Sequence, residues 1–130
     1  MRLGEYDFTK NNETRSKDFM VKYIYVHDEY DIATYENDIA IVRLDKPTTF
    51  NSYVWPICLP PRNRVYENEN VTVAGWGQVY FAGPPSEVLL EITIPIWNQQ
   101  KCIDSHTQRI TDTNLCAAAY EGGKDSCQVR

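Results

Sequence analysis

Among the 18 acidic residues and two histidines of this chain, Asp38, Asp125, His27 and His106 are the candidates for acid–base chemistry. Asp38 directly precedes a short apolar run, and Asp125 lies in a glycine-bearing loop two residues before Cys127. The histidines, His27 and His106, stand in polar surroundings. An imidazole paired with a carboxylate can act as a general base, whereas either group alone commonly serves as a turn, cap or surface residue. The residue types by themselves leave both interpretations open.

The cysteines and the glycosylation sequons indicate an oxidising compartment. The chain has four cysteines, and Asn12 and Asn70 each begin an N-x-[ST] sequon that could accept a glycan. The first seven residues lack the apolar core of a signal peptide. A chain of secreted character without that segment predicts further polypeptide upstream.

Composition and charge exclude two classes of partner. With 130 residues, 42% of them hydrophobic and 24% charged, the chain is predicted to be a single globular unit. A net charge of −5 offers no positive field for a nucleic-acid backbone. No apolar stretch reaches the roughly 18 residues of a membrane span.

Short strands must position these residues, because no long helical periodicity is present. Apolar or alternating runs separated by Gly, Pro, Asn and Asp predict strands over 21–26, 39–44, 71–74 and 88–94. A short helical turn is predicted after Asn98, which suits an N-cap, as far as Cys102. The polar segment 60–70 is expected to be an exposed connection. This arrangement is typical of an antiparallel sandwich or barrel.

Five blocks of sequence, taken in order, resemble the chymotrypsin/trypsin-like serine protease family. They are NDIAIVRL at 37–44, VWPICLP at 54–60, VAGWG at 73–77, the pair Cys102 and Cys116, and GGKDSCQ at 122–128. The resemblance implies an all-β fold, the double six-stranded antiparallel β-barrel. About half of each barrel is expected: residues 1–60 as a remnant of the first barrel with the link between barrels, and 61–130 as a remnant of the second. Open edges and uncovered apolar faces are therefore expected, which favours aggregation.

The resemblance also implies roles for individual residues. Asp38 matches the acid of the catalytic triad, which orients the imidazole and stabilises the imidazolium. Asp125 matches the floor of the S1 pocket, where a carboxylate pairs with Arg or Lys of the substrate. Ser126 matches a residue that lines the same pocket and is not the nucleophile. Tyr35 is expected either to border the neighbouring subsite or to serve in packing.

Two members of the triad have no match in this sequence. The family carries its base in an Ala-His-Cys string, which His27 does not match, and its nucleophile in Gly-Asp-Ser-Gly-Gly-Pro, where this chain has Val129 and Arg130 after Gln128. The chain is therefore predicted to be a fragment of a protease domain without peptidase activity. The alternative is a non-catalytic protease homologue that acts as a binding or decoy module.

The resemblance implies a disulfide between Cys102 and Cys116. In the family, Cys127 pairs with a downstream cysteine, and Cys58 ties the domain to an upstream chain in two-chain relatives. Both partners are expected outside this sequence, with a Cys58–Cys127 pair as the alternative. A disulfide-linked partner chain through Cys58 is thus one further hypothesis.

The branch of the family is suggested by GEYD at 4–7 and by Cys58, which look most like the arthropod clip-domain proteases of clotting and immune cascades. The resemblance implies an extracellular location and protein substrates or inhibitors with Arg or Lys at the cleavage site. No cofactor or metal is expected. One alternative is a calcium loop using oxygens of Glu5, Asp7 and Glu13, and the other is that these are charged loop side chains.

Overall fold

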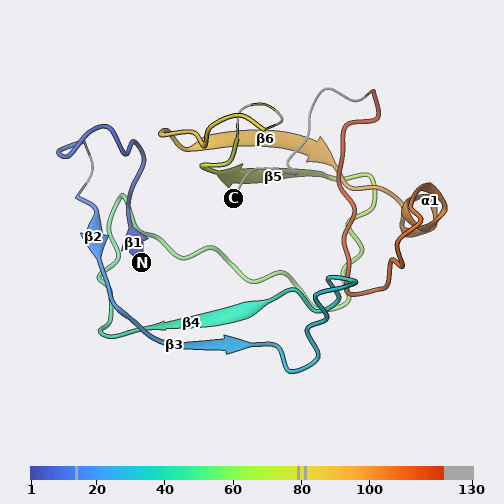
Figure 1. Ribbon diagram of the computed structural model, residues 1–130, viewed down its shortest axis with the longest axis horizontal. Coiled ribbons are helices and arrows are strands. Elements are labelled where there is room, and N and C mark those ends of the chain that lie inside the picture. Colours follow the sequence, from blue (N-terminus) through green and yellow to red (C-terminus); the bar gives the residue numbers. More distant parts are fainter. Residues whose placement is uncertain (14, 79, 81, 122–130) are drawn as a thin grey trace.

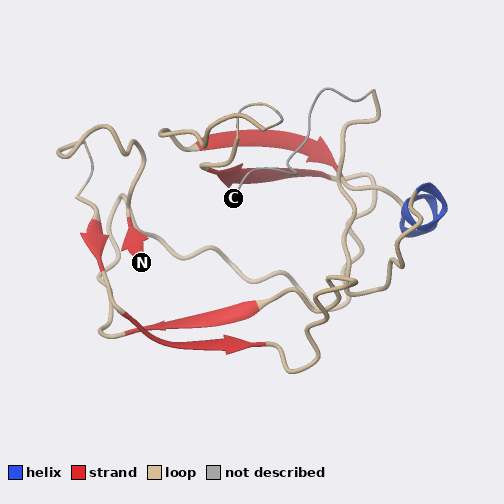
Figure 2. Ribbon diagram, in the orientation of Figure 1, coloured by secondary structure: helices blue, strands red, loops and turns tan. Residues whose placement is uncertain are grey.

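The computed structural model describes residues 1–13, 15–78, 80 and 82–121. Over these residues the chain forms three two-stranded antiparallel ladders and one helix. The elements are β1 (Arg2–Leu3), β2 (Lys17–Asp18), β3 (Val21–Val26), β4 (Ala40–Leu44), β5 (Asn70–Gly75), β6 (Leu90–Pro95) and α1 (Gln99–Ser105). The fold is all-β apart from the short helix, as predicted, and it is a partial trypsin-like β-barrel fold. Figure 2 shows how much of the chain between these elements is loop.

The β3–β4 ladder forms where the sequence predicts two strands, with the second strand one residue shorter than expected. Val26 pairs with Ala40 and Ile24 with Val42, and the register shifts between Val21 and Tyr23. β-branched and aromatic residues dominate β3, as a pleated strand favours. All six of its residues are nevertheless exposed, because no described segment covers either face.

The β5–β6 ladder lies on the other side of the molecule (Figure 1), and its residue Ile94 belongs to the small buried core. Its register runs from Asn70 opposite Pro95 to Gly75 opposite Leu90, and the ladder ends at the proline, which has no N–H to donate. Inward-facing residues alternate with exposed ones along β5. Ile94 is only 1% exposed. The predicted strands 71–74 and 88–94 are therefore confirmed, with small differences at their ends.

Helix α1 begins at the predicted cap. The Asn98 side chain accepts a hydrogen bond from the backbone N–H of Lys101 at 3.1 Å, and the helix continues three residues beyond the predicted end at Cys102. Cys102 is fully buried and forms a disulfide with Cys116, at a Cα–Cα distance of 6.2 Å. This is the pairing that the resemblance implied.

Two contacts join the first part of the chain to the second. In one, Phe8 and Glu87 pair through a backbone hydrogen bond of 2.9 Å, and the Trp76 indole donates to the carbonyl of Tyr6 at 3.1 Å. In the other, the loop between β3 and β4 meets the segment after α1, seen at the lower right of Figure 1. The division at residues 60 and 61 remains a prediction.

The molecule has a large accessible surface for its mass. It exposes 10710 Å², whereas a compact monomer of 15.1 kDa would expose about 7,100 Å². Large apolar side chains contribute to this surface, including Ile57 and Leu59, which are 92% and 89% exposed. The expectation of uncovered apolar faces is met over the described residues.

Candidate functional site

Asp38 lies at the end of a tight turn, two residues before β4. Tyr35 and Asn37 on its N-terminal side have left-handed backbones, with φ of 56° and 54°. The N–H of Ile39 donates to the carbonyl of Asn37 at 2.7 Å, which closes the turn around the aspartate. Asp38 is exposed, and its carboxylate accepts no hydrogen bond from the described residues. Its oxygens are thus free to accept from an external donor.

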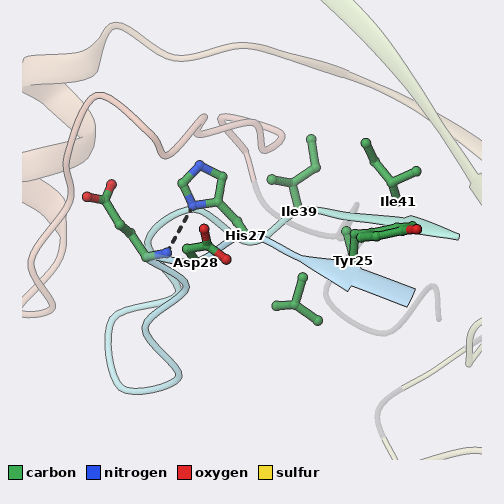
Figure 3. A pocket seen from close by; sticks show the side chains of 8 residues that line it. Tyr25, His27, Asp28, Ile39 and Ile41 are labelled. Atoms are coloured by element: carbon green, nitrogen blue, oxygen red, sulfur yellow. Dashed lines mark hydrogen bonds between the residues drawn. The ribbon is translucent and has the colours of Figure 1, made fainter. Parts of the chain in front are cut away.

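His27 lies at the end of β3, beside an open hollow of about 530 Å³ that Tyr25, Ile39 and Ile41 also line (Figure 3). Its Nδ1 accepts a hydrogen bond from the backbone N–H of Glu29 at 3.2 Å. A triad acid would have to contact Nδ1, and in His27 this nitrogen is already hydrogen-bonded within its own turn. No hydrogen bond joins His27 to Asp38.

His106 lies at the C-terminal end of α1. Its Nδ1 is 2.9 Å from the carbonyl oxygen of Cys102, four residues earlier. The last carbonyls of a helix have no partner within the helix, and His106 provides one for the carbonyl of Cys102. His106 makes no hydrogen bond to Asp38 either, so neither histidine forms a catalytic pair with the aspartate.

The other residues assigned to the protease site lie apart or outside the described structure. Tyr35 is 54% exposed, three residues before Asp38, and whether it borders a subsite stays a prediction. Asp125 and Ser126, expected in the S1 pocket, lie outside the described residues, as does Cys127. Cys58 is exposed and forms no disulfide with the other cysteines that the structure describes.

The loop that was considered for calcium is held by internal ion pairs. The Asp7 carboxylate, 5% exposed, accepts from the Thr9 hydroxyl at 2.6 Å and from the Lys10 ammonium at 2.9 Å. These contacts, the Thr9 hydroxyl first, lower the pKa of Asp7 to about 2. Lys10 also lies 3.2 Å from Glu13. Its ammonium therefore pairs with both carboxylates, and no further cation is needed between them.

Glu5 has other partners than that pair of acids. Its carboxylate pairs with Arg2 at 3.3 Å and accepts from the backbone N–H of Tyr6 at 2.9 Å. Over the described part of the chain, no group of three or more His, Cys, Asp and Glu side chains is arranged to hold a metal ion. As arranged, Glu5, Asp7 and Glu13 do not form one ligand set, which favours the interpretation as charged loop side chains.

The two sequon asparagines lie at the surface. Asn12 is exposed in the loop between β1 and β2, and Asn70 is exposed at the first position of β5. Both side chains are thus accessible to a modifying enzyme, and glycosylation stays a prediction. Among the described residues, no helix is long and apolar enough to cross a bilayer.

Sequence reasoning missed two features. One is the burial of Asp7, for which the D-x-T pattern with Thr9 was an available signal, since such aspartates cap their own turns. The other is the set of polar contacts between the Asp38 turn and Gln108, Thr113 and Asn114. These partners lie more than seventy residues apart in sequence, and no local pattern links them.

Comparison with known proteins gives a consistent result along the chain. The sequence model of the family described as Trypsin matches residues 1–129. The proclotting enzyme of Tachypleus tridentatus is 37% identical over 98% of this chain and 36% of its own length. The serine protease filzig of Drosophila melanogaster is 36% identical over 97% of the chain and 8% of its own length. Trypsin-1 of Astacus astacus is 36% identical over 96% of the chain and 52% of its own length.

The chain thus spans about half of the Astacus trypsin and smaller shares of the two longer relatives. The match includes the turn and strand that carry Asp38 and the disulfide-linked helix. On this match the chain belongs to the trypsin family of serine proteases.

Proposed function

We propose that this chain supplies the triad acid and the S1 carboxylate of a trypsin-like serine endopeptidase that cleaves after Arg or Lys in an extracellular proteolytic cascade. The observation that carries the proposal is the position of Asp38. It ends a constrained turn two residues before β4, within the part of the chain that matches the family, and presents a carboxylate with no hydrogen-bond partner among the described residues. A triad acid needs oxygens that are available to the Nδ1–H of an imidazole.

The acid would act through a histidine that another part of the protease provides. It accepts the Nδ1–H of the base, fixes the tautomer and stabilises the imidazolium while the serine attacks the peptide carbonyl. Asp125 would receive the guanidinium or ammonium of the substrate through charge-assisted hydrogen bonds. Ser126 would line that pocket, and the exposed Tyr35 would border the adjacent subsite.

These 130 residues by themselves are proposed to be inactive. His27 and His106 both direct Nδ1 to local backbone groups, and no serine matches the nucleophile motif. Loss of triad members lowers kcat by about a millionfold in a comparable hydrolase. The acid and the pocket floor alone therefore cannot support measurable hydrolysis.

The test compares the 130-residue polypeptide with the full-length protein that contains it, using an Arg amide, a Glu amide and a serine-directed phosphonate. We expect the full-length protein to cleave the Arg amide and to take up the phosphonate, and the short polypeptide to do neither. In the full-length protein, Asp38→Asn should lower kcat about 10⁴-fold. Asp28→Asn is the matched control, because this exposed aspartate on the same loop makes no hydrogen bond over the described chain.

Hydrolysis and phosphonate labelling of the short polypeptide would overturn the proposed inactivity. A full-length protein in which Asp38→Asn keeps wild-type kcat would overturn the assignment of the acid. These two outcomes are independent of each other.

A second candidate function rests on Cys58. Its exposed thiol lies on an apolar connection between Ile57 and Leu59, where a second chain could attach through a disulfide, and the chain would then act as a non-catalytic binding or decoy module. Non-reducing electrophoresis of the native protein distinguishes the candidates. A covalent partner lost in Cys58→Ser, with no activity at full length, would favour the decoy.

A further inference from the structure

The turn that carries Asp38 is held in place from the second part of the chain. Tyr35 and Asn37 have left-handed backbones, which residues with a Cβ adopt only at an energetic cost, less for asparagine than for tyrosine. Two such residues within three positions need outside support to persist. The hydrogen bonds that reach this turn from beyond residues 27–39 all come, over the described chain, from 108–114.

Three side chains of that segment each contact a different backbone group of the turn. The Gln108 amide donates to the carbonyl of Thr34 at 3.1 Å, and the Asn114 amide donates to the carbonyl of Tyr35 at 3.4 Å. The Thr113 hydroxyl oxygen accepts from the N–H of Asn37 at 3.3 Å. We call Gln108, Thr113 and Asn114 the turn clamp. An ion pair of 3.4 Å between Arg109 and Glu36 flanks it.

The turn clamp is itself firmly supported. The Asn114 carboxamide oxygen accepts from the N–H of Thr111 at 3.0 Å, so one side chain closes its own turn and reaches the Asp38 turn as well. The Gln99 amide of α1 donates to the carbonyl of Thr111 at 2.7 Å. Two residues beyond Asn114, the disulfide joins Cys116 to Cys102 in the same helix. A continuous series of contacts therefore runs from the buried disulfide to the residue next to Asp38.

We propose that Thr113 and Asn114 are positioning residues for Asp38, so that the second half of the chain sets the place of the catalytic acid carried by the first half. The expected effect on the reaction rate rests on the proposed function, whereas the contact between the turn clamp and the Asp38 turn does not depend on it. A carboxylate that shifts with a relaxed turn would orient the base less well, and a misplacement of about 1 Å can lower a rate by up to about 10²-fold.

The experiment uses the full-length protein with variants in the turn clamp. Thr113→Val deletes the acceptor for Asn37 and the hydroxyl contact to Thr111 at almost constant volume, and Thr113→Ser retains both. Asn114→Asp keeps the oxygen that serves Thr111 and loses the amide that serves Tyr35. Thr107→Val is the matched control, because this exposed threonine of the same segment makes no hydrogen bond over the described chain.

Two readouts separate positioning from general stability. Hydrogen exchange at the Asn37 amide should accelerate about tenfold in Thr113→Val, as expected when one net hydrogen bond is lost, with β5–β6 amides unchanged. With an Arg amide, kcat should fall about tenfold while KM stays within about twofold, since the lost contact acts on the acid and not on substrate binding. Thr113→Ser should restore both values, and Thr107→Val should match the wild type.

Each failure has its own meaning. Unchanged exchange at Asn37 in Thr113→Val overturns the coupling, whatever the activity. Faster exchange with an unchanged kcat overturns the positioning role. A wild-type protein that hydrolyses no Arg amide overturns the proposed function instead, and the exchange data then still decide whether the turn clamp holds the turn.

Discussion

The two long ladders of this molecule are built from similar residues but differ in burial. β3 and β4 pair over five or six residues each, yet Ile24 is 61% exposed. β5 and β6 pair over six residues, and Ile94 is 1% exposed. At the Pro95 end of the second ladder the chain returns beyond the disulfide: Ile96 pairs with Ala117, and the N–H of Ala118 donates to the carbonyl of Pro95 at 3.2 Å. The two ladders thus differ in burial because later segments of the chain contact β5–β6, and not because their strands differ in composition.

This contrast bears on the placement of Asp38. The aspartate lies two residues before β4, which belongs to the exposed ladder, whereas its turn is contacted by Thr113 and Asn114 from the second half of the chain. The acid of the proposed site thus depends on the better-packed part of the molecule.

The largest effect on the free energy of unfolding should come from truncating Ile94, and the same truncation at Ile24 is the comparison. Ile94→Ala should lower the free energy of unfolding by about 2–5 kcal/mol, because it leaves a cavity in a packed site. Ile24→Ala, the matched control on the open ladder, should change it by less than about 0.5 kcal/mol and should reduce self-association. Urea unfolding and sedimentation measure the two quantities. Equal losses at the two positions would mean that the open ladder is covered in solution.

The disulfide should have the next largest effect. It closes a loop with a sequence separation of 14, for which the chain-entropy model gives about 3 kcal/mol. The double variant Cys102→Ala with Cys116→Ala should lose about that amount in urea unfolding. The strand amides of β3–β4 should keep their exchange rates, whereas the Asn37 amide, which the turn clamp contacts, should exchange faster. Cys58→Ala, at an exposed thiol, is the control. An unchanged Asn37 amide would contradict support of the turn clamp by the disulfide.

The sequence predicted the parts of the fold that local pattern determines. Branched and aromatic runs located the strands, and Asn98 located the start of the helix, since a cap acts within three residues of itself. The burial of β5–β6 and the exposure of β3–β4 could not be predicted from those runs, because both depend on which distant segments return. The family resemblance identified Asp38, but the contacts of Thr113 and Asn114 join polar loop residues that carry no periodic signal.

The smallest effect should appear only in acid, at Asp7, which anchors the contact between the first part of the chain and 87–89. Its folded-state pKa of about 2 lies below the roughly 3.9 of an unfolded aspartate. Its contribution is therefore fully present above the unfolded value and is lost as pH falls towards 2, because protonation weakens the bonds from Thr9 and Lys10. An NMR titration of the Asp7 carboxyl should give a midpoint of about 2.

Two variants sharpen this prediction. Thr9→Val removes the hydroxyl that lowers the pKa most, so the Asp7 midpoint should rise. Asp7→Asn should flatten the acid limb of the stability profile between about pH 4 and pH 2, because the titrating group is gone. The amides of Leu89 and Phe8, which donate to the carbonyls of Tyr6 and Glu87, should then open at a rate that no longer depends on protonation at position 7. An Asp7 midpoint near that of an unfolded aspartate would contradict the prediction, because it would show that the loop opens in solution.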